Sequence, residues 1–120
     1  MHSEAGEFVL VLLHAATNAH LLHLRSKSYA EHMALGTFYE ELPGLVDVVA
    51  ESIQGLKGEL LEYPIDYFAP EATALDELLS LQEYVKVERK ELPQDSEVQN
   101  AIDAIAELIN STVYKLRFLS

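Results

Sequence analysis

The sequence predicts an all-α protein, a bundle of four antiparallel helices. Apolar residues recur at three- and four-residue steps through four segments, and capping or helix-breaking residues separate those segments. No stretch of useful length alternates apolar and polar residues as a half-buried strand does. Because 120 residues suit one hydrophobic core, residues 1–120 are predicted to form a single domain.

The first helix is predicted from about Ser3 to Leu24. Its main apolar stripe consists of Phe8, Val11, Leu12, Ala15, Ala19 and Leu22. Three further leucines, Leu10, Leu13 and Leu21, lie off that stripe. A helix with apolar residues on more than one side is buried deeply, or is buried twice, once in its own core and once against another chain.

The second helix is predicted to begin near Tyr29. Ser28 with Glu31 three residues later forms a capping box, the sequence signature of a helix start. The helix runs to about Gly55, and Pro43 inside it is expected to kink the helix or divide it.

A long apolar connector, residues 59–72, is predicted between the second and third helices. It is too apolar for a solvated loop, so a short helix or turn is expected there, held down by Tyr63, Tyr67 and Phe68.

The third and fourth helices are predicted from about Glu71 to Glu91 and from about Glu97 to Phe118. Pro93 ends the third, and Ser96 with Gln99 caps the fourth. Two antiparallel helix pairs joined by a longer linkage make a four-helix bundle.

Charge and composition limit the possible partners. Twenty acidic against eight basic residues give a formal charge of -12, which repels nucleic-acid phosphates, so no nucleic-acid partner is predicted. In the simplest interpretation, the acidic residues keep the protein soluble. Two more specific interpretations are that they concentrate metal cations or that they imitate DNA toward a basic protein partner.

Targeting signals are not expected. The apolar run from Phe8 to Leu13 is too short to span a bilayer and lacks a preceding Lys or Arg, so no signal peptide and no membrane association are predicted. The absence of cysteine excludes disulfides and thiolate metal sites and fits a reducing compartment, so a cytoplasmic location is predicted.

Histidines and carboxylates suggest a metal site. His20 lies near the end of the first helix and His32 in the first turn of the second, so the turn between them brings the two imidazoles together. Asp47 and Glu51 are four residues apart and share one helix face. Paired carboxylates bind hard divalent ions, and imidazoles complete a site for iron or zinc.

The predicted ligands cannot meet within one chain. His32 and Asp47 are fifteen residues apart on one helix, which corresponds to about 22 Å. A second copy packed antiparallel on a two-fold axis would place its Asp47 and Glu51 beside His20 and His32, with two identical sites per dimer. The predicted metal site is therefore intersubunit, and the predicted partner is a second copy in a two-fold dimer at least.

The spacing of His20, His32, Asp47 and Glu51 resembles the ferroxidase signature of the miniferritins, the ferritin-like starvation proteins called Dps. The likeness covers roughly residues 14–58, including the stretches from His20 to His32 and from Val46 to Ile53. It implies a ferritin-like bundle with two histidine ligands from one subunit and two acidic ligands from its mate. The implied chemistry is oxidation of ferrous iron by oxygen or peroxide, with mineral storage in a hollow shell.

The sequence departs from that family pattern at several points. Gly36 stands where the family usually has an acidic residue, and Leu21 replaces the usual aromatic residue. A basic N-terminal extension is missing from Met1 onward, and the chain is short. These departures fit a shortened, phage-encoded relative with an altered site, and they put iron turnover in doubt.

Other functions remain open, and no catalytic residue is assigned. No Gly-x-Ser-x-Gly motif and no cysteine are present to support nucleophilic hydrolysis. The chain could instead be an acidic helical interaction or inhibitor protein that binds a basic partner, or a plain oligomeric structural protein. Asp47 and Glu51 would then be ordinary exposed acids, and His20, His23 and His32 would line a dimer seam.

Overall fold

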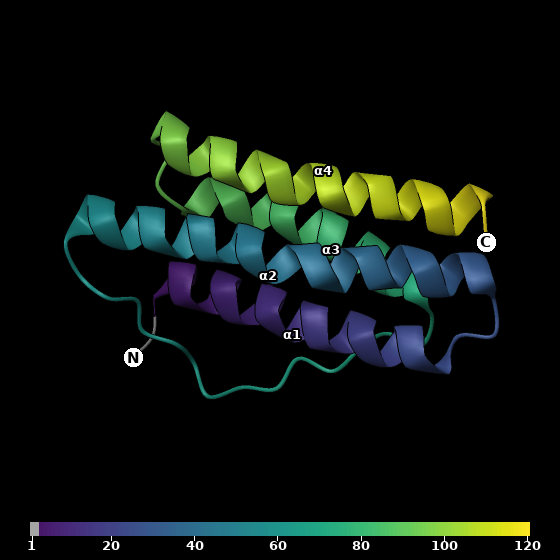
Figure 1. The fold of residues 1–120 in the computed structure, drawn as a ribbon. Helices are drawn as coiled ribbons and strands as arrows, with labels where there is room; N and C mark the ends of the chain where they lie inside the picture. The colour runs from purple at the N-terminus through teal and green to yellow at the C-terminus, as the bar shows by residue number, and fades with distance from the viewer. Residues whose placement is uncertain (1–2) are drawn as a thin grey trace.

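Four α-helices and one short 3-10 segment make up the regular structure of residues 3–120, the part of the chain that the computed structural model describes. Figure 1 shows them side by side. The helices are α1 (Glu4–Arg25), α2 (Tyr29–Lys57), α3 (Ala74–Glu88) and α4 (Ser96–Phe118), with the 3-10 segment at Arg89–Glu91. No strand occurs among these residues, so the predicted all-α class and the four helices are confirmed.

Neighbouring helices run antiparallel. α1 packs on α2, α2 packs on α4, and α3 packs on both α4 and α1. The connection from α2 to α3 is long and returns along α1 over the whole length of the bundle (Figure 1). We call residues 58–73 the connector; its residues 60–71 form neither helix nor strand, so the expected short helix is absent there.

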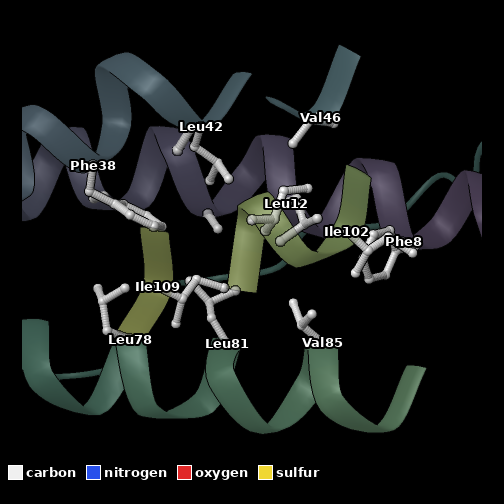
Figure 2. Close-up of a cluster of buried hydrophobic side chains, with 14 of the residues drawn as sticks. Phe8, Leu12, Phe38, Leu42, Val46, Leu78, Leu81, Val85, Ile102 and Ile109 are labelled. Atoms are coloured by element: carbon white, nitrogen blue, oxygen red, sulfur yellow. The ribbon is translucent and has the colours of Figure 1, made fainter. Parts of the chain in front are cut away.

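The core lies between the four helices. Figure 2 shows apolar side chains from every helix converging on the bundle interior. The largest fully buried side chains are Phe8, Leu12, Leu35, Phe38, Leu42, Ile53, Leu78, Ile102, Ile105 and Ile109. Each such side chain contributes roughly 1.5–3 kcal/mol by leaving water, so these helices depend on one another for stability.

The helix starts follow local capping signals. Ser3 Oγ accepts a hydrogen bond from the Gly6 amide, and Ser28 Oγ accepts one from the Glu31 amide at 3.2 Å. The predicted start of α2 at the Ser28 capping box is therefore confirmed. α2 ends before Gly58, whose φ of +71° is the left-handed conformation that glycine adopts most easily.

α2 runs through Pro43 as one helix, so of the two outcomes expected there, a kink or a division, the division does not occur. Leu42 and Val46, on either side of the proline, are both buried in the core. α3 begins at Ala74 rather than Glu71, since Thr73 Oγ1 caps it by accepting from the Asp76 amide.

Helix α1 is long enough and apolar enough to cross a membrane, judged by its length and composition alone. An 18-residue window of it has a mean hydropathy of 1.3, and 56% of that window is buried within the bundle. The core helix of a bundle has the same properties, so the pattern is weak evidence for a membrane span.

Candidate functional site

The turn between α1 and α2 is short and internally hydrogen-bonded. The Ser28 amide donates to Ser26 Oγ at 3.2 Å, and that hydroxyl lies 2.5 Å from Glu31 Oε2. Because these groups hold residues 26–28 in place, the last turn of α1 faces the first turn of α2.

Two histidines pair across this turn. The rings of His23 and His32 stack with centroids 3.7 Å apart and planes 16° from parallel. The Nδ1 of each lies close to the backbone carbonyl of the other: His32 Nδ1 is 2.9 Å from His23 O, and His23 Nδ1 is 2.5 Å from His32 O.

This reciprocal pairing fixes the tautomer of both rings. A carbonyl oxygen only accepts hydrogen bonds, so each Nδ1 must carry the proton that it donates. In the neutral ring, Nε2 is then left with an unprotonated lone pair. Metal-binding histidines commonly have this arrangement, with a carbonyl holding the other nitrogen.

His20 and Tyr39 complete the group, which we call the imidazole cluster (His20, His23, His32 and Tyr39). The His20 ring stacks on the Tyr39 ring at 4.0 Å, with planes 7° from parallel, and the His20 and His23 centroids are 6.2 Å apart. His20 is exposed, whereas His23, His32 and Tyr39 are half-buried. The imidazoles that the turn brings into contact are therefore those of His23 and His32, and the His20 ring lies beside Tyr39 and His23. The predicted contact of His20 with His32 is not among the ring contacts of residues 3–120.

Gly36 has a steric role beside the cluster. A Cβ at this position would lie 3.2 Å from Cε1 and 3.4 Å from Nδ1 of His23. The His23 ring thus occupies the space that a side chain at position 36 would need. Gly36 is therefore explained by local packing against the His23 ring.

Asp47 and Glu51 do not join the cluster within the chain. Both are exposed on α2, several turns away from His32, and neither makes a hydrogen bond or ion pair with the rest of residues 3–120. Within that range, no group of three or more His, Asp and Glu side chains is placed to hold a metal ion. Any metal site that uses these two carboxylates with the histidines needs a second copy.

Helices α1 and α2 and the turn between them also carry exposed apolar side chains. They are Leu13, Leu21, Leu24, Tyr29, Met33 and Val48. Charges on this helix pair are unevenly distributed. Arg25 and Lys27 lie at the turn, whereas Asp47 and Glu51 lie toward the opposite end of α2.

A second polar group anchors the connector onto α1 and α3. The Phe68 amide donates to His14 Nδ1 at 3.3 Å, and Asn18 Nδ2 donates to Phe68 O at 2.9 Å. The Glu71 amide donates to Glu77 Oε1 at 3.0 Å. Burial raises the pKa of the Glu77 carboxyl above its usual value, although hydrogen bonds from Glu71 and Asn18 oppose that shift.

Carboxylates also gather where the start of α1 meets the end of α3. The pKa of Glu88 is raised, first by desolvation and then by the negative charges of Glu7, Glu4 and Glu91. Burial, together with Glu7 and Glu88, also raises the pKa of the Tyr84 hydroxyl. Four carboxylates therefore lie within electrostatic reach of one another at this end of the bundle.

Sequence reasoning missed the central member of the imidazole cluster. The sequence analysis places His23 only at a hypothetical dimer seam. The three-residue spacing of His20 and His23 places both on neighbouring parts of one helix face and could have indicated the cluster. Stacking on Tyr39 has no sequence signal, because it depends on the register of the two helices.

A family model described as a family of unknown function (DUF5856) matches residues 23–116, most of the chain. The chain belongs to this family. It is also 38% identical over 56 residues to an uncharacterized 14.6 kDa protein from the mobD-ri intergenic region of Enterobacteria phage T4. That alignment covers 47% of this chain and 44% of the phage protein, so the chain spans less than half of its relative's length. No solved structure matches.

These comparisons correct the family assignment. The resemblance to ferritin-like, Dps-type proteins is wrong, because the matching family is the DUF5856 family and the similar curated protein is an uncharacterized phage protein. The expected link to phage proteins is the part of that prediction which the comparisons support. The misleading signal was the spacing of four polar residues, a pattern that any antiparallel helix pair with histidines near its turn can produce.

Proposed function

We propose that this DUF5856 protein is a homodimer that binds divalent transition-metal ions between its subunits. In each site, His20 and His32 of one protomer act together with Asp47 and Glu51 of the partner subunit. The observation that carries the proposal is the reciprocal pairing of His23 and His32, which leaves their Nε2 lone pairs free for an ion.

Charge and surface support an antiparallel dimer. The α1–α2 pair has histidines and Lys27 toward one end and Asp47 with Glu51 toward the other, so a two-fold copy brings the acidic side chains beside the histidines. Exposed leucines such as Leu13 and Leu24 lie on the same helix pair and would be buried by the copy.

The donor set determines the kind of ion. Imidazole nitrogens suit zinc, iron, copper and nickel, while carboxylates add affinity for harder ions. Zinc or iron are the ions that a mixed site of this kind holds, and Co²⁺ is a useful probe because its absorption reports coordination. The proposal covers binding only and assigns no oxidation of the metal.

The test is a Co²⁺ and Zn²⁺ titration of the purified protein at neutral pH. We expect one ion per chain, and an affinity loss of at least about tenfold for His20→Ala and for Asp47→Asn, since each removes a ligand. Glu107→Gln, an exposed carboxylate change on α4, is the matched control and should bind like the wild type.

Mixing the two ligand variants tests the intersubunit geometry. A dimer of one His20→Ala chain and one Asp47→Asn chain contains one intact site and one doubly damaged site. After subunit exchange about half of the dimers are mixed, so the mixture should regain about a quarter of the strong binding sites. A monomeric protein in sedimentation, or a mixture that binds no better than either variant alone, contradicts the proposal.

A second candidate function is binding of a basic protein partner. It is favoured by the carboxylates that gather around Glu88, whose pKa is raised first by desolvation and then by the negative charges of Glu7, Glu4 and Glu91, and by the formal charge of -12. Such binding weakens as salt screens the charges. An association with a basic protein that is unchanged in high salt would contradict it.

A further inference from the structure

The connector presents apolar side chains to solvent although it is firmly anchored. Ile65 is fully exposed, Leu60 is 81% exposed and Tyr67 is 74% exposed. A loop with no binding role usually carries polar residues at such positions. The exposure of these residues is therefore a feature to be explained.

Anchors lie on both sides of the exposed stretch. On one side, Glu62 O accepts a hydrogen bond from the Ser3 amide and is packed directly over Gly6, where a Cβ would lie 1.8 Å from that oxygen. On the other side, Phe68 is held by hydrogen bonds to His14 and Asn18. The Phe68 ring also packs beside the His14 imidazole, with centroids 5.6 Å apart.

Residues 63–67 between these anchors have free backbone groups. The amides of Ile65, Asp66 and Tyr67 donate no hydrogen bond to any group within residues 3–120. The segment follows an extended course along the outside of α1 (Figure 1). An extended segment with free amides can pair with the backbone of another extended peptide.

The charge of this region specifies the chemistry of a partner. Residues 58–85 contain seven acidic residues and no Lys, Arg or His. Among the acids, Glu59, Glu62 and Asp66 lie in the exposed part of the connector itself. A second copy of the same acidic segment would be repelled, whereas a basic segment would be attracted.

We infer that residues 60–67 of the connector form a docking surface for an extended peptide segment that combines basic and apolar side chains. Apolar side chains of the partner pack on Leu60, Ile65 and Tyr67, and its cations pair with Glu62 and Asp66. This inference deepens the second candidate function, binding of a basic partner, and does not depend on metal binding.

The probe is a fluorescent synthetic peptide of alternating lysine and valine, with its anisotropy measured against the full-length protein at low salt. The wild type should bind, and Ile65→Ser or Asp66→Lys should each weaken binding at least about fivefold, as truncation of a central interface residue does. Both side chains are exposed, so the variants should fold like the wild type.

Matched controls separate the connector from general effects of charge and hydrophobicity. Phe118→Ser and Glu107→Lys alter exposed residues of α4 and should change the affinity by less than about twofold. A peptide of alternating lysine and serine should bind more weakly than the lysine–valine peptide, because it lacks the apolar side chains.

Several outcomes overturn the inference. If the wild type does not bind the peptide at all, binding of a basic partner fails together with its proposed location. If the wild type binds but the connector variants bind equally well, the basic partner stands and only the location is wrong. If Ile65→Ser dissociates an oligomer without peptide, or abolishes binding to phosphatidylcholine vesicles, the surface belongs to a second copy or to a lipid instead.

Discussion

The turn that joins α1 to α2 and the connector that joins α2 to α3 are held in place by different kinds of contact. The α1–α2 turn spans three residues and is held by groups close in sequence, such as Ser26, Ser28 and Glu31. The α2–α3 connector spans residues 58–73 and is held by His14 and Asn18, which are about fifty residues away along the chain. Local chemistry fixes the turn, whereas packing against a finished helix fixes the connector.

The largest effect should come from filling the space under the connector. Gly6→Ala would place a Cβ 1.8 Å from Glu62 O, so the connector must move away from α1. We expect a loss of about 1–3 kcal/mol in the free energy of unfolding, as for other overpacked sites. Urea denaturation measures this loss.

Gly55→Ala is the control for the glycine substitution itself. No atom lies within 4 Å of a Cβ at this helical position, so the substitution should stabilise the protein by roughly 0.5–1 kcal/mol through helix propensity. If both alanine variants stabilise the protein to the same degree, the connector is not pressed against α1 and the contrast with the turn disappears.

A smaller effect should follow from weakening the turn. Ser28→Ala removes the hydroxyl that accepts from the Glu31 amide at the start of α2. Loss of such a cap costs about 1 kcal/mol in the free energy of unfolding, which thermal or urea unfolding resolves. Ser111→Ala, at an exposed position within α4, should be neutral or slightly stabilising. Equal destabilisation by the two serine variants would show that the cap adds nothing.

The smallest effect concerns pH and the anchoring carboxyl of the connector. Because burial raises the pKa of Glu77, the folded state binds this proton more tightly than the unfolded state does. The resulting stabilisation is fully present below the unfolded-state pKa of about 4.3 and is lost as pH rises through the folded-state pKa. Glu77→Gln keeps the acceptor for the Glu71 amide but cannot ionise.

Unfolding of the wild type and Glu77→Gln at several pH values tests this sign. We expect the variant to gain stability relative to the wild type as the pH rises from about 4 toward neutral. A gain in the opposite direction would mean that the hydrogen bonds from Glu71 and Asn18 outweigh burial. Glu107→Gln removes a charge from an exposed position and should change stability by less than about 0.5 kcal/mol.

The candidate metal site was predictable in part. The capping box at Ser28 indicated where the chain turns, and this was enough to expect a histidine of α1 beside His32 of α2. The sequence could not reveal that this histidine is His23, because its stacking on His32 depends on the register of two helices. The role of Gly36 was hidden in the sequence for the same reason. It depends on the position of the His23 ring, which occupies the space that a side chain at position 36 would need.

The sequence by itself determined the four helices, their apolar faces and the position of the first turn. These features arise from periodicity and from hydrogen bonds between residues a few positions apart, so local patterns are sufficient to read them. Only the tertiary structure decided the course of the connector and the pairing of His23 with His32. Those features depend on side chains distant in sequence, whose contacts exist only once the helices have packed.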